Sequence, residues 1–314
     1  MYTRPMGILR ILFKKQIRSK LMSAIPSGRR PKHLTVGRIG MYCFILVCAI
    51  FFLMPLYVMV ITSLKDMDEI RAANILNLPK ELSFYSWPKA WSTACTGFVC
   101  EGLKPGFFNS IKITVPSVIV SVGLSAINGY ALAFWRFKGA YFFFGLCMFG
   151  AFIPYQVMVY PLLKIEDALG IYSTLPGIIL VHTIFGMPIL TLIFRNFYAS
   201  LPIDLFKAAR IDGGNFIKIF LYVIIPMSAP ITIVAVILQV TGIWNDFLLG
   251  LVFAGRDNQP MTVQLNNIVQ VDYGVAEYNV DMSATILTSL VPLFVYFISG
   301  RWFVRGIAAG AIKG

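Results

Sequence analysis

Charged side chains are scarce in this 314-residue chain: they make up 13% of it, against about a quarter in an average soluble domain. Hydrophobic residues make up 58%. A chain this long and this apolar is not disordered, and it fits an ordinary cytosolic enzyme poorly. The composition favours a protein that spans a membrane several times.

The chemistry of hydrolases and of nucleotide binding is also missing. The chain has two histidines, His33 and His182, and contains no HExxH, paired CxxC, GxSxG or phosphate-loop motif. We therefore expect no catalytic residues, no metal site and no cofactor. His182 stands alone in an apolar run, where packing or a hydrogen bond is the expected role.

Six continuous apolar runs are long enough to cross a bilayer, which takes roughly 20 helical residues. Because they are continuous and do not alternate, they predict helices and not a β-barrel. We predict an all-α integral membrane protein with six transmembrane helices. The runs cover approximately residues 39–61, 111–135, 140–163, 175–194, 222–243 and 282–300.

Lys and Arg are distributed unevenly between the two sides of these spans. One side carries 19 of them with two acids, and the other carries eight with the remaining 12 acids. The positive-inside rule places both termini in the cytoplasm. The net charge of +13 is then a signal of topology and of attraction to anionic lipid, and nucleic acid is not an expected partner.

A basic cytoplasmic arm, residues 1–38, precedes the transmembrane domain, residues 39–314. Its segment 8–15 is amphipathic, and it fits equally a helix on the inner leaflet and a partly disordered retention arm. The long outer loop between spans one and two carries Cys95 and Cys100. In an oxidising compartment these two form a disulfide, and two free thiols remain the alternative.

The longest inner loop, residues 196–221, predicts a short helix over residues 202–211. Pro202 suits a helix start, and Asp204 falls in the first turn, where a carboxylate complements the helix dipole. The pair Gly213-Gly214 ends the helix, and Asn215 caps the next one. An ordinary surface helix is the simpler interpretation of this pattern.

Two motifs resemble those of a known family. Residues Lys207-Ala208-Ala209-Arg210-Ile211-Asp212-Gly213, followed by Ile225-Pro226, resemble the "EAA" loop of ABC-importer permeases, in the form of their carbohydrate-uptake branch. The C-terminal tail, residues 301–314, is similar to that of the maltose-type "G" permease subunit, and the overall look is closest to glucose/mannose-type permeases. Further similar pieces are Asn109-Ser110 and Trp244-Asn245-Asp246-Phe247.

The resemblance implies a subunit of a sugar importer in a bacterial or archaeal cytoplasmic membrane. Its partners would be a second permease, two cytosolic ABC ATPases that hydrolyse ATP, and an extracytoplasmic sugar-binding protein. Lys207 stands where the family has Glu, so the polar details of the ATPase contact differ. The implied ATPase-coupling residues are Lys207, Ala208, Ala209, Asp212 and Gly213. The implied contact loop for the binding protein is Gly255, Arg256, Asp257, Asn258 and Gln259.

Neutral polar side chains at membrane depth are the candidates for the solute path. Hydroxyl, amide and aromatic groups suit an uncharged sugar, although each group also fits a hydrogen bond between helices. Other functions left open are a permease for a polyol, glycerol phosphate or oligosaccharide, and a self-contained secondary carrier. The carrier is disfavoured because the central turns of all six spans lack Asp and Glu. The path candidates are Asn128, Tyr130, Tyr155, Gln156, Gln239 and Asn245.

Overall fold

The computed structural model describes residues 36–311, apart from residues 73, 97–98, 136 and 271–275, with side chains up to residue 300. The predicted features of the basic arm before residue 36 lie outside this range. Across the described residues the secondary structure is helical, with one isolated β-bridge between Thr96 and Val99. The predicted all-α class is confirmed.

Two units make up the chain, Met1–Pro55 and Leu56–Gly314. Within the first, the described part is the beginning of helix α2 (Val36–Ser63). The second unit contains the remaining helices and both hydrophobic cores. Everything that follows concerns this second unit unless α2 is named.

Four helices are long and apolar enough to cross a membrane: α2, α5 (Lys104–Phe134), α8 (Leu175–Ala199) and the Tyr278–Gly300 part of α15 (Tyr278–Ala311). Two further spans form only if bent helix pairs each count as one, so the described chain has four to six candidate spans. The six apolar runs of the sequence all fall on these segments.

The two bent pairs are where the structure departs from straight spans. Helix α6 (Ala140–Phe152) meets α7 (Tyr155–Ala168) at 110°, and the segment Phe216–Met227 meets α12 (Ala229–Trp244) at 80°. Pro154 lies in the first break and Pro230 begins the helix after the second. Proline lacks the backbone N–H that would continue the helical ladder, so these sites are where a helix breaks.

Helices α5 and α8 pack closely along the main core. A side chain at Gly129 would place its Cβ 2.7 Å from the Cβ of Phe194. Buried Ser117, Ser121 and Ser125 add further small residues to the same helix, and the Ser125 hydroxyl donates to the Met187 carbonyl at 3.1 Å. Small side chains allow two membrane helices to approach and to form such bonds.

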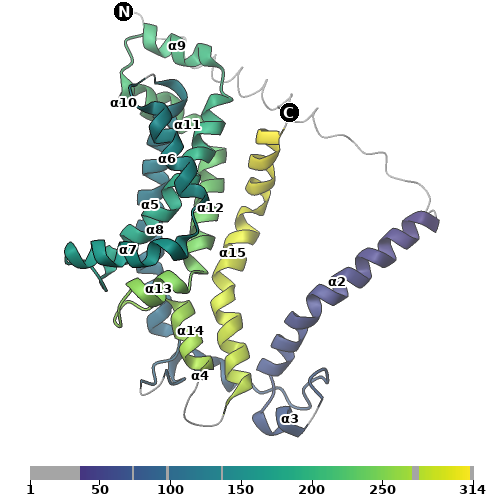
Figure 1. Cartoon of the computed structure of the whole chain (residues 1–314). Helices are drawn as coiled ribbons and strands as arrows, with labels where there is room; N and C mark the ends of the chain where they lie inside the picture. Colours follow the sequence, from purple (N-terminus) through teal and green to yellow (C-terminus); the bar gives the residue numbers. More distant parts are fainter. Residues whose placement is uncertain (1–35, 73, 97–98, 136, 271–275, 312–314) are drawn as a thin grey trace, which may run out of the picture. The chain divides into compact units, whose positions relative to one another are not determined.

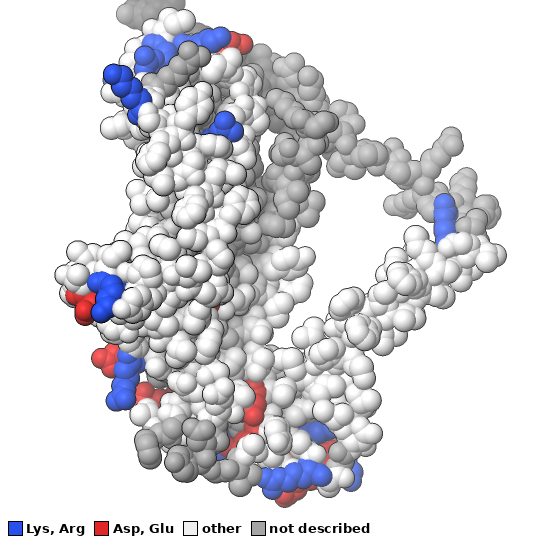
Figure 2. All heavy atoms as spheres, viewed as in Figure 1, with Lys and Arg blue, Asp and Glu red and all other residues white. Residues whose placement is uncertain are grey.

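Short helices cover the two ends of this bundle (Figure 1). At one end lie α9 (Ile203–Ile211), α10 (Phe216–Ile219), the π-helical turn Phe220–Ile224 and α11 (Ile225–Met227). At the opposite end lie α3 (Met67–Ala72), α4 (Ser86–Ser92), α13 (Leu248–Phe253) and α14 (Met261–Val269). On the face drawn in Figure 2, charged side chains gather at these ends and around α7, with a largely uncharged band between.

Candidate functional site

Helix α9 forms where the sequence predicts it, directly after Pro202, and it ends at Ile211. The Asp212 N–H donates to the Ala208 carbonyl at 3.0 Å, and the Gly214 N–H donates to the Ala209 carbonyl at 2.9 Å. Between them Gly213 has φ +79°, a left-handed conformation that glycine adopts freely. Asn215 then caps α10 by accepting from the Lys218 N–H at 2.9 Å.

The two glycines after α9 serve different purposes. A Cβ on Gly213 would meet nothing within 4 Å, so only its backbone conformation requires glycine. A Cβ on Gly214 would lie 2.6 Å from the Ala209 carbonyl oxygen and 2.7 Å from Ile219 Cγ1. Gly213 therefore sets the direction of the chain, and Gly214 lets α9 and α10 approach.

An aromatic cluster fastens α9 to the end of α5; we call it the aromatic anchor. The Phe206 ring stacks on Phe134 with centroids 4.9 Å apart and meets Trp135 edge-on at 5.9 Å. The Arg210 guanidinium lies 4.6 Å from the centre of the Trp135 ring, a cation–π distance. The anchor consists of Tyr130, Phe134, Trp135, Phe206, Phe216 and Phe220.

The predicted coupling residues fall on two faces of this region. Lys207, Ala208, Asp212 and Gly213 are exposed, whereas Ala209 is half-buried against the chain's own core. The Lys207 ammonium lies 3.5 Å from an Asp204 carboxylate oxygen, and both side chains are largely exposed. The surface that α9 offers outward is therefore narrow at Ala208 and carries a charged pair beside it.

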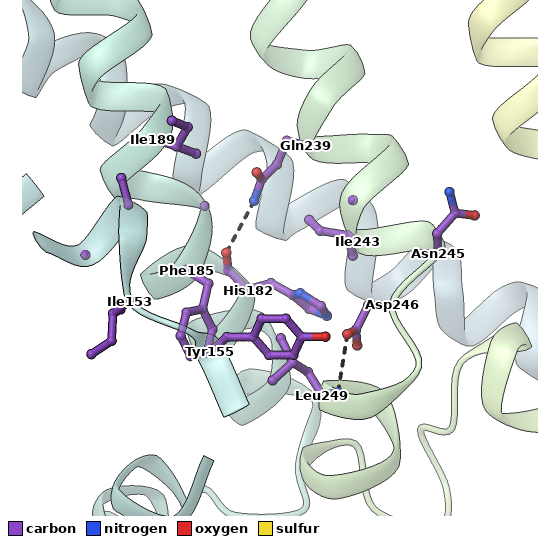
Figure 3. Close-up of a pocket in the computed structure, with 14 residues that line it drawn as sticks. Ile153, Tyr155, His182, Phe185, Ile189, Gln239, Ile243, Asn245, Asp246 and Leu249 are labelled. Carbon is purple, nitrogen blue, oxygen red and sulfur yellow. Dashed lines mark hydrogen bonds between the residues drawn. The ribbon is translucent and has the colours of Figure 1, made fainter. Parts of the chain in front are cut away.

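A cavity of about 450 Å³, which we call the central cavity, lies at the break between α6 and α7, bounded by α8, α12 and α13 (Figure 3). Three of the six predicted path residues line it: Tyr155, Gln239 and Asn245. The Gln239 amide donates to the His182 carbonyl at 3.3 Å. Gly186 leaves room for Gln239, because a Cβ there would collide with the amide group.

The other three predicted path residues lie elsewhere. Tyr130 is fully buried in the aromatic anchor, where its hydroxyl donates to the Phe216 carbonyl at 3.3 Å. Asn128 is half-buried, Gln156 is exposed, and neither lines the cavity. Side chains that are close together on one helix extend into different surroundings, and their depth in the membrane alone did not reveal which of them line the cavity.

His182 and Asp246 also line this cavity, and the sequence did not single them out for it. In Figure 3 the side chains of Tyr155, His182 and Asp246 extend to the same side of the cavity. The Asp246 carboxylate accepts from the N–H groups of Leu249 at 3.3 Å and Gly250 at 2.9 Å. Burial raises the pKa of the Asp246 carboxyl, and these two hydrogen bonds counteract part of that rise.

The loop after α13 meets the start of α5 at the end opposite α9. The Asn109 amide donates to the carbonyls of Asp257 at 2.9 Å and Gln259 at 3.3 Å. Gly255, where this loop begins, has φ +69°. Here a polar cavity of about 580 Å³ brings Arg256, Asp257 and Gln259 together; Gly255 and Asn258 do not line it.

In the structure a disulfide joins Cys95 and Cys100, which is one of the two states that the sequence left open. In sequence, the two bonded cysteines flank the isolated β-bridge between Thr96 and Val99. Thr96, Val99 and Glu101 line the same polar cavity as the loop after α13. The remaining cysteines are unpaired: Cys147 is buried, Cys48 is partly buried and Cys43 is exposed.

Residues 121–309 match the family described as "Binding-protein-dependent transport system inner membrane component". The chain belongs to this family. It is therefore a transport subunit embedded in a membrane, in agreement with the resemblance found in the sequence. The match includes α9, the central cavity and the loop after α13.

Individual proteins give the same result. The chain is 36% identical over 215 residues to the "Osmoprotective compounds uptake permease protein GgtD" of Synechocystis sp., covering 68% of this chain and 72% of that protein. It is 27% identical to the "Arabinooligosaccharides transport system permease protein AraQ" of Bacillus subtilis, covering 91% and 99%. A solved structure, "Crystal structure of a bacterial ABC transporter involved in the import of the acidic polysaccharide alginate", shares the fold with TM-score 0.73, 20% identity and coverage of 87% and 99%.

Proposed function

We propose that this chain is a permease subunit of an ATP-driven importer for a carbohydrate. Family membership supports the transport role, and the names of similar proteins include arabino-oligosaccharides and alginate. The central cavity adds support from chemistry: amide, phenol, imidazole and carboxyl groups line it beside Phe185. Hydrogen-bonding groups next to an aromatic ring suit a sugar, which has many hydroxyls and apolar ring faces.

The observation that carries the proposal is the construction of α9. This helix has no buried residue, yet Phe206 and Arg210 contact the end of α5. Its connection to α10 is fixed by the left-handed conformation of Gly213 and by the close packing at Gly214. Such a helix transmits a push to the spans without unfolding. In the proposed function, a cytosolic ABC ATPase receives its exposed side at Ala208, Asp212 and Gly213.

In the proposed function, movement of α9 reaches the spans through the break at Ser228, between α11 and α12. Helices α10 and α11 and the π-helical turn between them lead directly from Asn215 to the 80° bend before α12. A π-helical turn frequently marks a functional site in a helix. We infer that movement of α9 tilts α12 and alters the cavity that Gln239 and Asn245 line, with opening toward alternate sides.

Six spans, both termini in the cytoplasm and three kinds of protein partner complete the proposal. The proposal counts each bent pair as one span, and the positive-inside rule supports a cytoplasmic position for α9 and the positively charged loops. The loop Gly255–Gln259 then faces outward, toward an extracytoplasmic sugar-binding protein. A second permease completes the translocation path, and two ATPases supply the energy.

The test is reconstitution of the complex in proteoliposomes with its binding protein. Uptake of a labelled carbohydrate should require ATP, and this chain alone should hydrolyse none, because it has no phosphate loop. Uptake by the isolated chain driven by an ion gradient would instead indicate a secondary carrier. If the complex takes up a polyol or glycerol phosphate and no sugar, the carbohydrate assignment is wrong while the permease role stands.

A further inference from the structure

A third cavity, of about 260 Å³, lies away from α9 and from the central cavity. Val58 and Thr62 belong to the last two turns of α2, and Tyr278 and Met282 to the first turns of α15. Both helices are candidate spans, and the cavity lies at one end of each of them. Its walls are Val58, Thr62, Lys65, Ile70, Asn74, Ile75, Tyr278 and Met282.

Lys65 is the unusual member of this set. Its residue surface is only 2% exposed. Within the part of the chain that the structure describes, Lys65 takes part in neither the Lys89–Glu277 nor the Lys207–Asp204 ion pair, and no hydrogen bond from its ammonium is found. A lysine side chain with so little exposed surface ordinarily has a counter-charge, and since Lys65 lines the cavity, an anion from outside this chain can supply one there.

The backbone that carries Lys65 is held firmly. The Ser63 carbonyl accepts from the Ser86 hydroxyl at 2.6 Å, and the Leu64 carbonyl accepts from the Ser83 N–H at 3.0 Å. The Lys65 carbonyl accepts from the Asn279 amide at 3.1 Å. Three consecutive carbonyls are thus bound by three separate partners, which fixes where the Lys65 side chain starts.

The remaining walls combine a few polar groups with a mostly apolar surface. Asn74 uses its side-chain oxygen to accept from the Leu76 N–H at 3.1 Å, which leaves its amide N–H groups as donors. Thr62 and Tyr278 each add a hydroxyl group. Ile75, which lines the cavity, is 62% exposed, so an apolar surface continues outward from it.

We propose that this cavity binds the phosphate of a phospholipid headgroup, with Lys65 as its counter-charge. The phosphodiester accepts hydrogen bonds from the ammonium and the Asn74 amide, and the adjoining hydrocarbon lies against Val58, Ile70 and Met282. Tyrosine and lysine at the end of a span are the side chains that meet lipid headgroups. A lipid accounts for both features of the cavity, because its anionic and apolar parts are joined in one molecule.

The experiment measures lipid binding to the complete, delipidated transporter complex in detergent. Phosphatidylglycerol is added, and bound lipid is counted by native mass spectrometry while the Tm is followed. Lys65→Gln should bind this lipid about tenfold more weakly, the effect of losing one charge-assisted hydrogen bond. Lys65→Arg should retain binding, and Lys80→Gln, which removes an exposed lysine of the same segment, should leave it unchanged.

Two further variants and conditions separate the alternatives. Met282→Trp keeps the charge but fills the cavity, and it should also weaken lipid binding. Without lipid, Lys65→Gln should be at least as stable as the wild type, because an unpaired buried charge is removed. Equal lipid binding by Lys65→Gln and wild type overturns the proposal. An equal rise of the Tm with inorganic phosphate and with lipid also overturns it. So does loss of the second permease from the Lys65→Gln complex with and without lipid, because that result would indicate that a carboxylate of the partner permease is the counter-charge.

Discussion

The guanidinium of Arg210 lies over the indole ring of Trp135, 4.6 Å from its centre, and joins α9 to the end of α5. Arg210 is exposed, so its charge remains solvated while its flat face covers the ring. Phe206 meets the same indole edge-on. One tryptophan thus receives two side chains from consecutive turns of α9, and it is the main fixed point of that helix.

Trp135→Ala should uncouple transport from ATP hydrolysis while the protein remains in the membrane. The cation–π contact at such an exposed site is worth about 0.5–1 kcal/mol, and the lost aromatic contacts add to it. We expect reduced carbohydrate uptake per ATP hydrolysed in the reconstituted complex. Lys218→Ala, which removes an exposed cation from the neighbouring helix α10, is the matched control and should retain coupling. Normal coupling in Trp135→Ala would show that the aromatic anchor transmits nothing.

Two substitutions at the same position, Gly213→Val and Gly213→Asn, should lower carbohydrate uptake to different extents. The site has φ +79° and free space, so the cost is one of conformation, roughly 1–3 kcal/mol for a β-branched residue. Asparagine tolerates the left-handed region better. We expect Val to lower uptake strongly and Asn to lower it mildly, with ATPase activity and membrane abundance measured alongside. Equal and normal uptake in both variants would reduce this loop to a connector.

Substitutions at Ala208 and Ala209 distinguish contact with the ATPase from packing against the chain's own core. Ala208→Asp places a charge on the exposed side, so it should weaken assembly with the ATPase and leave this subunit folded. Ala209→Asp places the charge against the chain's own core, so it should lower the subunit's thermal stability as well. Lys207→Glu, the residue usual in the resembling family, should be mild. Co-purification of the ATPase and the Tm of the complex distinguish these outcomes, and identical behaviour of the two Asp variants contradicts the assignment of faces.

The disulfide predicts a specific labelling result. In intact cells, Cys95 and Cys100 should resist a membrane-impermeant thiol reagent until a reductant is added, because they are bonded to each other. Cys95→Ser with Cys100→Ser should lower the response of ATP hydrolysis to the binding protein, since Thr96, Val99 and Glu101 line the polar cavity beside the loop after α13. Labelling of the same two cysteines after reduction provides the internal control. Labelling of both cysteines before reduction would contradict the bond.

Hydropathy and local turn chemistry predicted a large part of this protein. The six apolar runs, the end of α9 at Gly213 and the cap at Asn215 are all in the structure, because each depends on residues close in sequence. The bends of 110° and 80° were not predicted, since a proline marks a break without giving its angle. The central cavity was predicted only in part. Tyr130 points into the aromatic anchor, while His182 and Asp246 reach the cavity from helices distant in sequence.

Tyr155 and Gln156 provide the sharpest test of the solute path, because they are adjacent and only Tyr155 lines the central cavity. Gln239→Leu removes the amide from the cavity wall at nearly constant volume, and Tyr155→Phe removes one hydroxyl. If a sugar hydroxyl binds either group, each loss should weaken transport by about 1 kcal/mol, or several-fold in apparent KM. Gln156→Leu should leave uptake unchanged. The measurement is the rate of uptake at increasing sugar concentration. The binding protein is kept at saturating concentration, so that its binding to the permease does not limit the rate. Unchanged KM in both cavity variants, with normal assembly, would place the path elsewhere, and an effect of Gln156→Leu alone would place it on the other side of α7.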